Sequence, residues 1–213
     1  EVFDFGPWRF IQYANQNFTA AYFDHNGRYS FGRQPEAALW ALTQLGKSFN
    51  KLINEKRIIE ILNEFSTTFH LSLKRHFCWR IGIQDIDAKS LSEIMNVLLN
   101  ESEKHKIEFA SFFYDFFGGK EAVIDCLKTN YGNKYKVEGF LKITDILKDS
   151  QSSKGALEKR KLINNNRENM LIDEVEQIWE EINKNDNWKL LEKKISKVRK
   201  LGNSLESQKL VNF

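Results

Sequence analysis

Apolar side chains recur every three or four positions along most of residues 35–148, which predicts a protein built mainly from amphipathic α-helices. The first of these helices opens on Pro35 and Glu36, a proline and an acid where a first helical turn favours them. Its apolar positions are Ala38, Leu42, Leu45 and Phe49. We expect this to be a core helix, covered by the segment that precedes it.

A longer helix is predicted between Asn54, a suitable N-cap, and Gly82, a suitable end. Its apolar repeat is Ile58, Ile59, Leu62, Phe65, Phe69, Leu73 and Phe77. His70 and His76 lie on this helix six positions apart, on different faces. That spacing does not suit a helical metal pair, so we expect both histidines in solvent or at the edge of the core.

Further helices are predicted up to residue 148. Ser90 and Glu93 have the spacing of a capping box at the start of one of them. Residues 106–117 are apolar nearly all round and end in two glycines, so this segment should be buried centrally. Asp115 lies within it, and we expect a buried, paired carboxylate that serves structure rather than catalysis. Residues 120–130 and 136–148 complete the set.

The composition changes at residues 149–169, which are polar and rich in turn-forming residues, so a linker or surface loop is predicted there. Residues 170–213 then predict two more helices. The second carries a basic strip that we interpret as a solvated face rather than a binding patch, because acids lie nearby. The strip consists of Lys189, Lys193, Lys194, Lys197, Arg199 and Lys200.

Residues 8–34 lack a clean period of either 2 or 3.6 and are predicted to form a long, functional loop. Its aromatic side chains are expected to pin the loop onto the helices beneath it. They are Trp8, Phe10, Tyr13, Phe18, Tyr22, Phe23, Tyr29 and Phe31.

Composition narrows the class of protein. Hydrophobic residues make up 41% and aromatic residues 13% of the chain, too much for a disordered chain. The net charge of +3 gives no sign of a nucleic-acid partner, and no apolar run of about 18 residues indicates a membrane span. With only two cysteines, Cys78 and Cys126, we expect a reducing, cytoplasmic location without a disulfide framework.

The candidate chemistry lies at the start of the chain. Asp4-Phe5-Gly6-Pro7 contains the tract with which protein-kinase-like folds place a carboxylate on the magnesium of ATP. Alone, these residues are better explained as a strand end running into a Gly-Pro turn. They are followed, however, by Asp24-His25-Asn26-Gly27-Arg28-Tyr29-Ser30-Phe31, by Gln34-Pro35, and by Ala37 and Ala38 with Trp40.

This ordered set resembles the selenoprotein O (SelO) family, protein-kinase-like enzymes that transfer AMP from ATP to protein hydroxyls. The chain departs from the family at Ala41, where the family usually has Asn. The resemblance continues in the phenylalanine-rich segment closed by glycines, and more loosely in Asn166-Arg167-Glu168-Asn169. Arg28 and Gln34 match the family without an assignable role.

The resemblance implies a helical, protein-kinase-like C-lobe. Residues 1–34 would form the metal-binding tract and activation-type loop, residues 35–148 the lobe's core, residues 149–169 a polar linker, and residues 170–213 C-terminal helices. The N-lobe is expected to be missing, since the chain contains no Gly-rich phosphate loop and no catalytic-loop tract. The mitochondrion is the alternative location that the family allows.

Asp4 is the one site residue that the resemblance assigns, as a ligand of Mg²⁺ (or Mn²⁺) bound to ATP. The catalytic residues are expected upstream of Glu1, and the partners are ATP and protein substrates. The family is often regulated by a disulfide between this loop and the C-terminus, but residues 1–77 contain no cysteine, so the loop partner of that disulfide is absent.

Two other functions remain open. The chain could be a non-catalytic helical binding module derived from a kinase-like C-lobe. It could also be part of an ordinary phosphate-transferring kinase, which the lack of an Ala-Pro-Glu tract after the loop disfavours.

Overall fold

A computed structural model describes residues 10–20 and 23–206, and within these ranges the chain is helical apart from loops and two isolated β-bridges. The prediction of a mainly α protein is therefore confirmed. Its identity as a kinase-like C-lobe, and the division into four regions, stay predictions. No helix in the described ranges is both long enough and apolar enough to cross a membrane.

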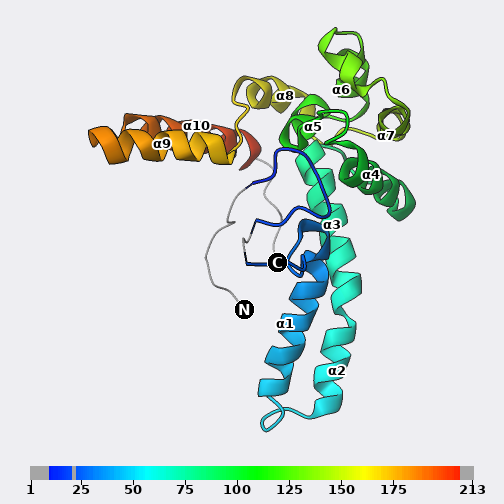
Figure 1. Ribbon diagram of the computed structural model, residues 1–213. Helices are drawn as coiled ribbons and strands as arrows, with labels where there is room; N and C mark the ends of the chain where they lie inside the picture. Colours follow the sequence, from blue (N-terminus) through cyan, green and yellow to red (C-terminus); the bar gives the residue numbers. More distant parts are fainter. Residues whose placement is uncertain (1–9, 21–22, 207–213) are drawn as a thin grey trace.

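Helices α1 (Gln34–Ser48) and α2 (Glu55–Asn63) form an antiparallel hairpin that projects from the body of the molecule (Figure 1). Asn54 caps α2 as predicted, since its side-chain oxygen accepts the Lys56 N–H at 2.9 Å. The long helix predicted from here to Gly82 is divided at Glu64 into α2 and α3 (Phe65–Ile81). Gly82 ends α3 with a φ of +71°, which glycine adopts without strain.

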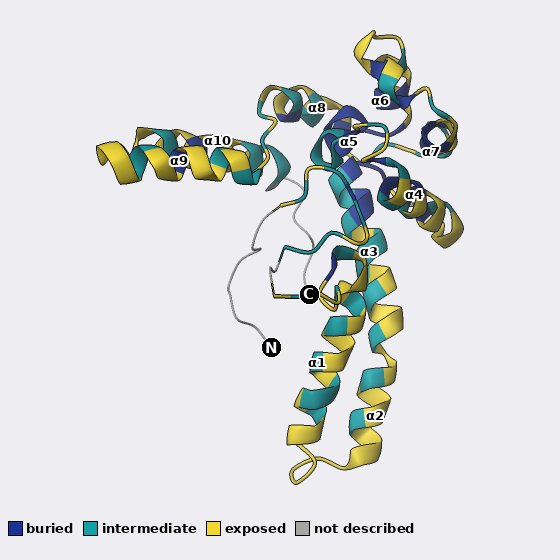
Figure 2. Ribbon diagram, in the orientation of Figure 1, coloured by how far each residue is buried: buried dark blue, intermediate teal, exposed yellow. Residues whose placement is uncertain are grey.

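Helix α1 is not the core helix that its apolar repeat predicted. None of its residues is buried, and Leu42, Leu45 and Phe49 are 41%, 54% and 39% exposed (Figure 2). The reason is that α1 packs on α2 along a different side, where a Cβ at Gly46 would lie 2.7 Å from Ile58. In the described part of the chain, the predicted apolar face of α1 is left largely in solvent.

The main core lies where the end of α3 meets four further helices: α4 (Ala88–Glu101), α5 (Phe109–Asp115), α6 (Lys120–Leu127) and α7 (Glu138–Lys148). A 3₁₀ segment, η2 (Tyr131–Tyr135), connects α6 to α7. Phe112, Phe116 and Phe117 are fully buried, which confirms central burial of the phenylalanine-rich segment. Its helix is shorter than the predicted 106–117 because Lys106 has a φ of +55° in the turn before it.

The predicted capping box at Ser90 and Glu93 is wrong. The N-cap of helix α4 lies three residues before Ser90, because the Asp87 side chain accepts the Ser90 N–H at 3.0 Å. Asp87 is thus the N-cap, and Ser90 lies inside the first turn.

The predicted linker at residues 149–169 contains a helix, α8 (Ala156–Asn165). Ala156 and Ile163 are fully buried, and Arg160 pairs with Asp125 of α6 at 2.8 Å. The polar composition misled the prediction because only two apolar residues anchor α8. The two helices predicted next are present as α9 (Ile172–Asn185) and α10 (Lys189–Glu206), and they form a second projecting hairpin (Figure 1).

Candidate functional site

Asp4, the only residue predicted to hold magnesium and ATP, lies outside the described residues, as does the whole Asp4–Pro7 tract. Its role stays a prediction. The structure does describe most of the loop that follows, including the tract led by Asp24, and that loop is the candidate site.

The loop is irregular, as predicted, and its first half is held against the turn before α5. Phe109 donates its N–H to the Gln12 carbonyl at 2.8 Å, and Tyr13 forms a bridge with Glu108. Asn15 adds a side-chain hydrogen bond to Glu103 at 2.8 Å. These contacts across roughly ninety residues fix the position of the loop relative to the core.

The loop then folds back on itself before α1. Phe31 and Gly32 donate their N–H groups to the carbonyls of Phe18 and Gln16, at 2.9 and 2.8 Å. The Phe31 ring packs edge-on against Phe109, with 6.1 Å between centroids, so Phe31 is one of the predicted aromatic anchors. Phe10, Phe23 and Tyr29 are 52%, 59% and 40% exposed and do not fill the core.

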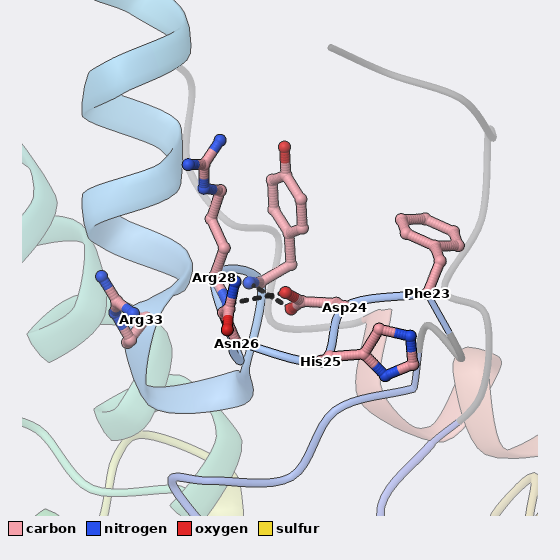
Figure 3. A pocket seen from close by; sticks show the side chains of 7 residues that line it. Phe23, Asp24, His25, Asn26, Arg28 and Arg33 are labelled. Carbon is pink, nitrogen blue, oxygen red and sulfur yellow. Dashed lines mark hydrogen bonds between the residues drawn. The ribbon is translucent and has the colours of Figure 1, made fainter.

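Asp24 organises the tract that follows it (Figure 3). Its two carboxylate oxygens accept the backbone N–H groups of Arg28 and Tyr29, at 2.8 and 2.7 Å. Gly27, with a φ of +62°, makes the turn between them. The function of Asp24 visible here is therefore to shape the loop and to hold Arg28 at its edge.

Two hollows open beside this turn. The first, of about 370 Å³, is lined by Phe23, Asp24, His25, Asn26, Arg28, Tyr29 and Arg33. The second, of about 270 Å³, shares Arg28, Tyr29 and Arg33 with the first and continues onto α1 at Glu36, Ala37 and Trp40. Arg28, to which sequence reasoning gave no role, thus belongs to both hollows. Gln34 begins α1 and lines neither.

The described residues do not supply a metal centre. No group of three or more His, Cys, Asp and Glu side chains in residues 10–20 and 23–206 is arranged to hold an ion. Both oxygens of Asp24 are already hydrogen-bonded to the backbone. His70 lies on α3 with its Nδ1 2.6 Å from the Ser66 carbonyl.

Asp115 is a buried, paired carboxylate, as predicted. Its side chain is 2% exposed and pairs with Arg167 at 2.6 Å and with Lys134 at 3.1 Å. It also accepts the Tyr135 hydroxyl at 2.5 Å, and burial together with the Asp115 charge raises the pKa of that phenol well above its usual range. This arrangement joins α5, η2 and the segment after α8, which is a structural role.

The Asn166–Asn169 segment, loosely matched to the family, is the partner of two buried charges. Besides Arg167 on Asp115, Glu168 pairs with Lys194 at 2.6 Å and with Lys197 at 2.8 Å. Lys194 is 3% exposed and also pairs with Glu174. Lys194 is therefore not part of the predicted solvated strip. No local sequence pattern distinguishes it from the other basic residues of α10.

Both cysteines are free and buried. Burial raises the pKa of each thiol to about 11. Neither thiol has the exposed, acidic character of a redox switch.

Comparison with known proteins decides the family. The profile described as protein adenylyltransferase SelO matches residues 1–199, which is nearly the whole chain and includes the Asp24 turn. The chain belongs to the SelO family. The resemblance that the loop tracts indicated is thus confirmed, and with it membership of a family of protein nucleotidyltransferases.

Individual SelO relatives carry the name protein nucleotidyltransferase YdiU. That of Trichormus variabilis is 29% identical over 115 residues, which are 54% of this chain and 24% of that protein. That of Synechocystis is 41% identical over 69 residues, 32% of this chain and 14% of the relative. That of Vibrio cholerae is 28% identical over 132 residues, 59% of this chain and 26% of the relative. The chain thus spans about a quarter or less of the length of these relatives.

Proposed function

We propose that this chain is the C-terminal part of a protein adenylyltransferase, which moves AMP from Mg-ATP onto Ser, Thr or Tyr hydroxyls of proteins. The observation that carries the proposal is the family match, which covers Asp4-Phe5-Gly6 together with the loop behind it. The structure supports it by holding that loop as one shaped element between the core and α1.

In this proposal the residues have separate tasks. Asp4 binds the magnesium ion, which when bound offsets the charge of the reacting phosphate. Asp24 keeps the following turn in shape through its two backbone hydrogen bonds. Phe31 and the residues before it anchor the loop to α5, so that its outer edge presents Arg28 to solvent.

We expect these 213 residues to transfer no AMP by themselves. The sequence contains no Gly-rich phosphate loop and no catalytic-loop tract, and those parts bind ATP and position the acceptor in kinase-like folds. The full activity would require a longer polypeptide, of the length that the relatives have.

The second candidate is a non-catalytic helical binding module. The observation in its favour is the exposed apolar surface of the α1–α2 hairpin, where Leu45 is 54% and Leu52 81% exposed. Apolar surface of this kind often marks a protein interface.

The test is labelling by the polypeptide that carries this sequence, isolated as its own cell makes it. With magnesium and ATP labelled at the α-phosphate, label should enter protein, whereas label at the γ-phosphate should not. The Asp4→Asn variant should abolish incorporation, while Asp145→Asn, whose carboxylate is exposed and pairs with Lys148, should leave it unchanged.

Each other outcome has a distinct meaning. Incorporation of γ-label would indicate an ordinary kinase reaction. Absence of both labels would favour the binding module, and activity retained in Asp4→Asn would remove Asp4 from the site.

A further inference from the structure

The two hollows beside the Asp24 turn share Arg28, Tyr29 and Arg33 in their linings and are here together called the Arg28 groove. It is defined by the residues that line the hollows: Phe23, Asp24, His25, Asn26, Arg28, Tyr29, Arg33, Glu36, Ala37 and Trp40. It runs from the loop onto the first two turns of α1, and Figure 3 shows Arg28 and Arg33 on its α1 side.

Within the part of the chain that the structure describes, the charges in the groove leave Arg28 without a counterion. Arg33 pairs with Glu36 at 3.1 Å, and Asp24 uses both carboxylate oxygens on backbone N–H groups. The Arg28 side chain has no hydrogen-bond or ion-pair partner among residues 10–20 and 23–206. The Asp24 hydrogen bond fixes the Arg28 backbone, and the exposed guanidinium that it carries is well suited to pair with a carboxylate of another molecule.

Aromatic side chains line the same groove as Arg28. Tyr29 is 40% and Trp40 45% exposed, and both line the half of the groove that lies on α1. Tryptophan, tyrosine and arginine are the residues that dominate binding energy where proteins meet. Because Ala37 is small, an apolar side chain can lie against Trp40 there.

We propose that the Arg28 groove binds an extended segment of a partner protein, with a carboxylate on Arg28 and an adjacent apolar side chain on Trp40. The idea that this partner is the acceptor of AMP rests on the proposed function. The binding of such a segment to the groove does not depend on that function, because binding requires neither nucleotide nor metal.

The charge pattern favours a polypeptide over a nucleic acid. A single-stranded nucleic acid carries a charge at every phosphate and needs a track of cations along its backbone. Among the described residues the groove offers Arg28 as an unpaired cation, and the carboxylates of Asp24 and Glu36 line the same surface.

The experiment uses two peptide libraries with randomised flanks and a fixed central residue, glutamate in one and glutamine in the other. Both are passed over the immobilised 213-residue chain without ATP or magnesium. The chain should retain the glutamate library about tenfold better, the effect of one charge-assisted hydrogen bond, and should select apolar residues next to the glutamate.

Variants then locate the binding. Arg28→Gln should remove the preference for glutamate, and Trp40→Ala should weaken retention about tenfold and remove the apolar selection. Both side chains are exposed, so circular dichroism should be unchanged. The matched controls are Arg57→Gln on α2 and Trp179→Ala on α9, an exposed arginine and an exposed tryptophan away from the groove.

Equal retention of the two libraries by the unchanged chain would overturn the proposal, and this comparison requires no variant to fold. A glutamate preference that survives in Arg28→Gln would also overturn the proposal. So would displacement of the bound peptides by a uridine decamer at a concentration below that of the peptides. Because labelling at the α-phosphate is measured separately, failure here leaves the AMP-transfer proposal intact, and the reverse also holds.

Discussion

At the scale of single residues, Asp115 shows how one buried carboxylate can join three segments of the chain. Its partners come from η2, through Lys134 and Tyr135, and from the segment after α8, through Arg167. A buried carboxylate that loses its partners is costly, and so are partners that lose their carboxylate. The stability of the molecule should therefore depend strongly on this residue.

We expect Asp115→Asn to lower the free energy of unfolding by about 3 kcal/mol, the lower end for breaking a buried ion pair, because Lys134 and Arg167 partly reach solvent. Urea unfolding followed by circular dichroism measures this change. Asp145→Asn, which alters an exposed carboxylate on α7, is the control and should have little effect. Equal stability of the two variants would contradict the structural role of Asp115.

Glu168 should contribute stability that depends on pH. Burial alone would raise the pKa of Glu168, but hydrogen bonds from Lys194 and Lys197 lower it below its usual value. A carboxyl group whose pKa is lower in the folded state stabilises the protein above its unfolded pKa of about 4.3, and this contribution is lost as pH falls through the folded pKa.

Glu168→Gln should therefore destabilise the chain at pH 7, by about 2 kcal/mol, because Lys194 is left buried with one partner fewer. The difference in unfolding free energy between the two proteins should shrink as pH falls below about 4. Urea titrations at pH 7, 5 and 3.5 measure it. A difference that stays constant over this range would mean that the ionised carboxylate is not what stabilises the fold.

At the scale of elements, helical periodicity was enough to predict nearly every helix but not which of their faces are buried. The repeat Ala38, Leu42, Leu45 and Phe49 correctly predicted α1 as a helix, yet most of that face is exposed. Burial depends on which elements lie nearby, and sequence spacing carries no information about that. Helix α8 was missed for the opposite reason, since it is anchored by only two buried apolar side chains.

Helix starts were harder still, because several residues near α4 have capping side chains. The structure selects Asp87, whose pKa is lowered by its hydrogen bond to Ser90. Asp87→Ala should lower Tm by about 2–4 °C, the usual effect of losing an N-cap in a chain of this size. Ser90→Ala should leave Tm nearly unchanged. Thermal unfolding of both variants measures this, and the reverse order of effects would restore the capping box at Ser90 and Glu93.

At the scale of the whole molecule, the family could be predicted from the loop tracts, whereas the Arg28 groove could not. Gly27-Arg28-Tyr29 is visible in the sequence, but the availability of Arg28 depends on how its neighbours are paired. Asp24 is engaged by the backbone and Glu36 by Arg33, and neither pairing has a distinctive sequence signal. Which charged side chain of a site stays available depends on which of its neighbours are already paired.

The two cysteines give a test of the whole core, because Cys78 lies at the end of α3 and Cys126 on α6, both against the main cluster. With thiol pKa values raised to about 11, each should react with iodoacetamide at pH 8 at least about 100-fold more slowly than an exposed thiol.

Labelling of both should instead follow cooperative unfolding in urea, with intact mass showing no label or two labels and few singly labelled molecules. Lys51→Cys, in the exposed loop between α1 and α2, supplies the matched reactive thiol and should be labelled within the native state. If Cys126 reacted as fast as that introduced thiol while Cys78 stayed protected, α6 would open independently of α3. The core would then consist of two separately stable parts rather than one.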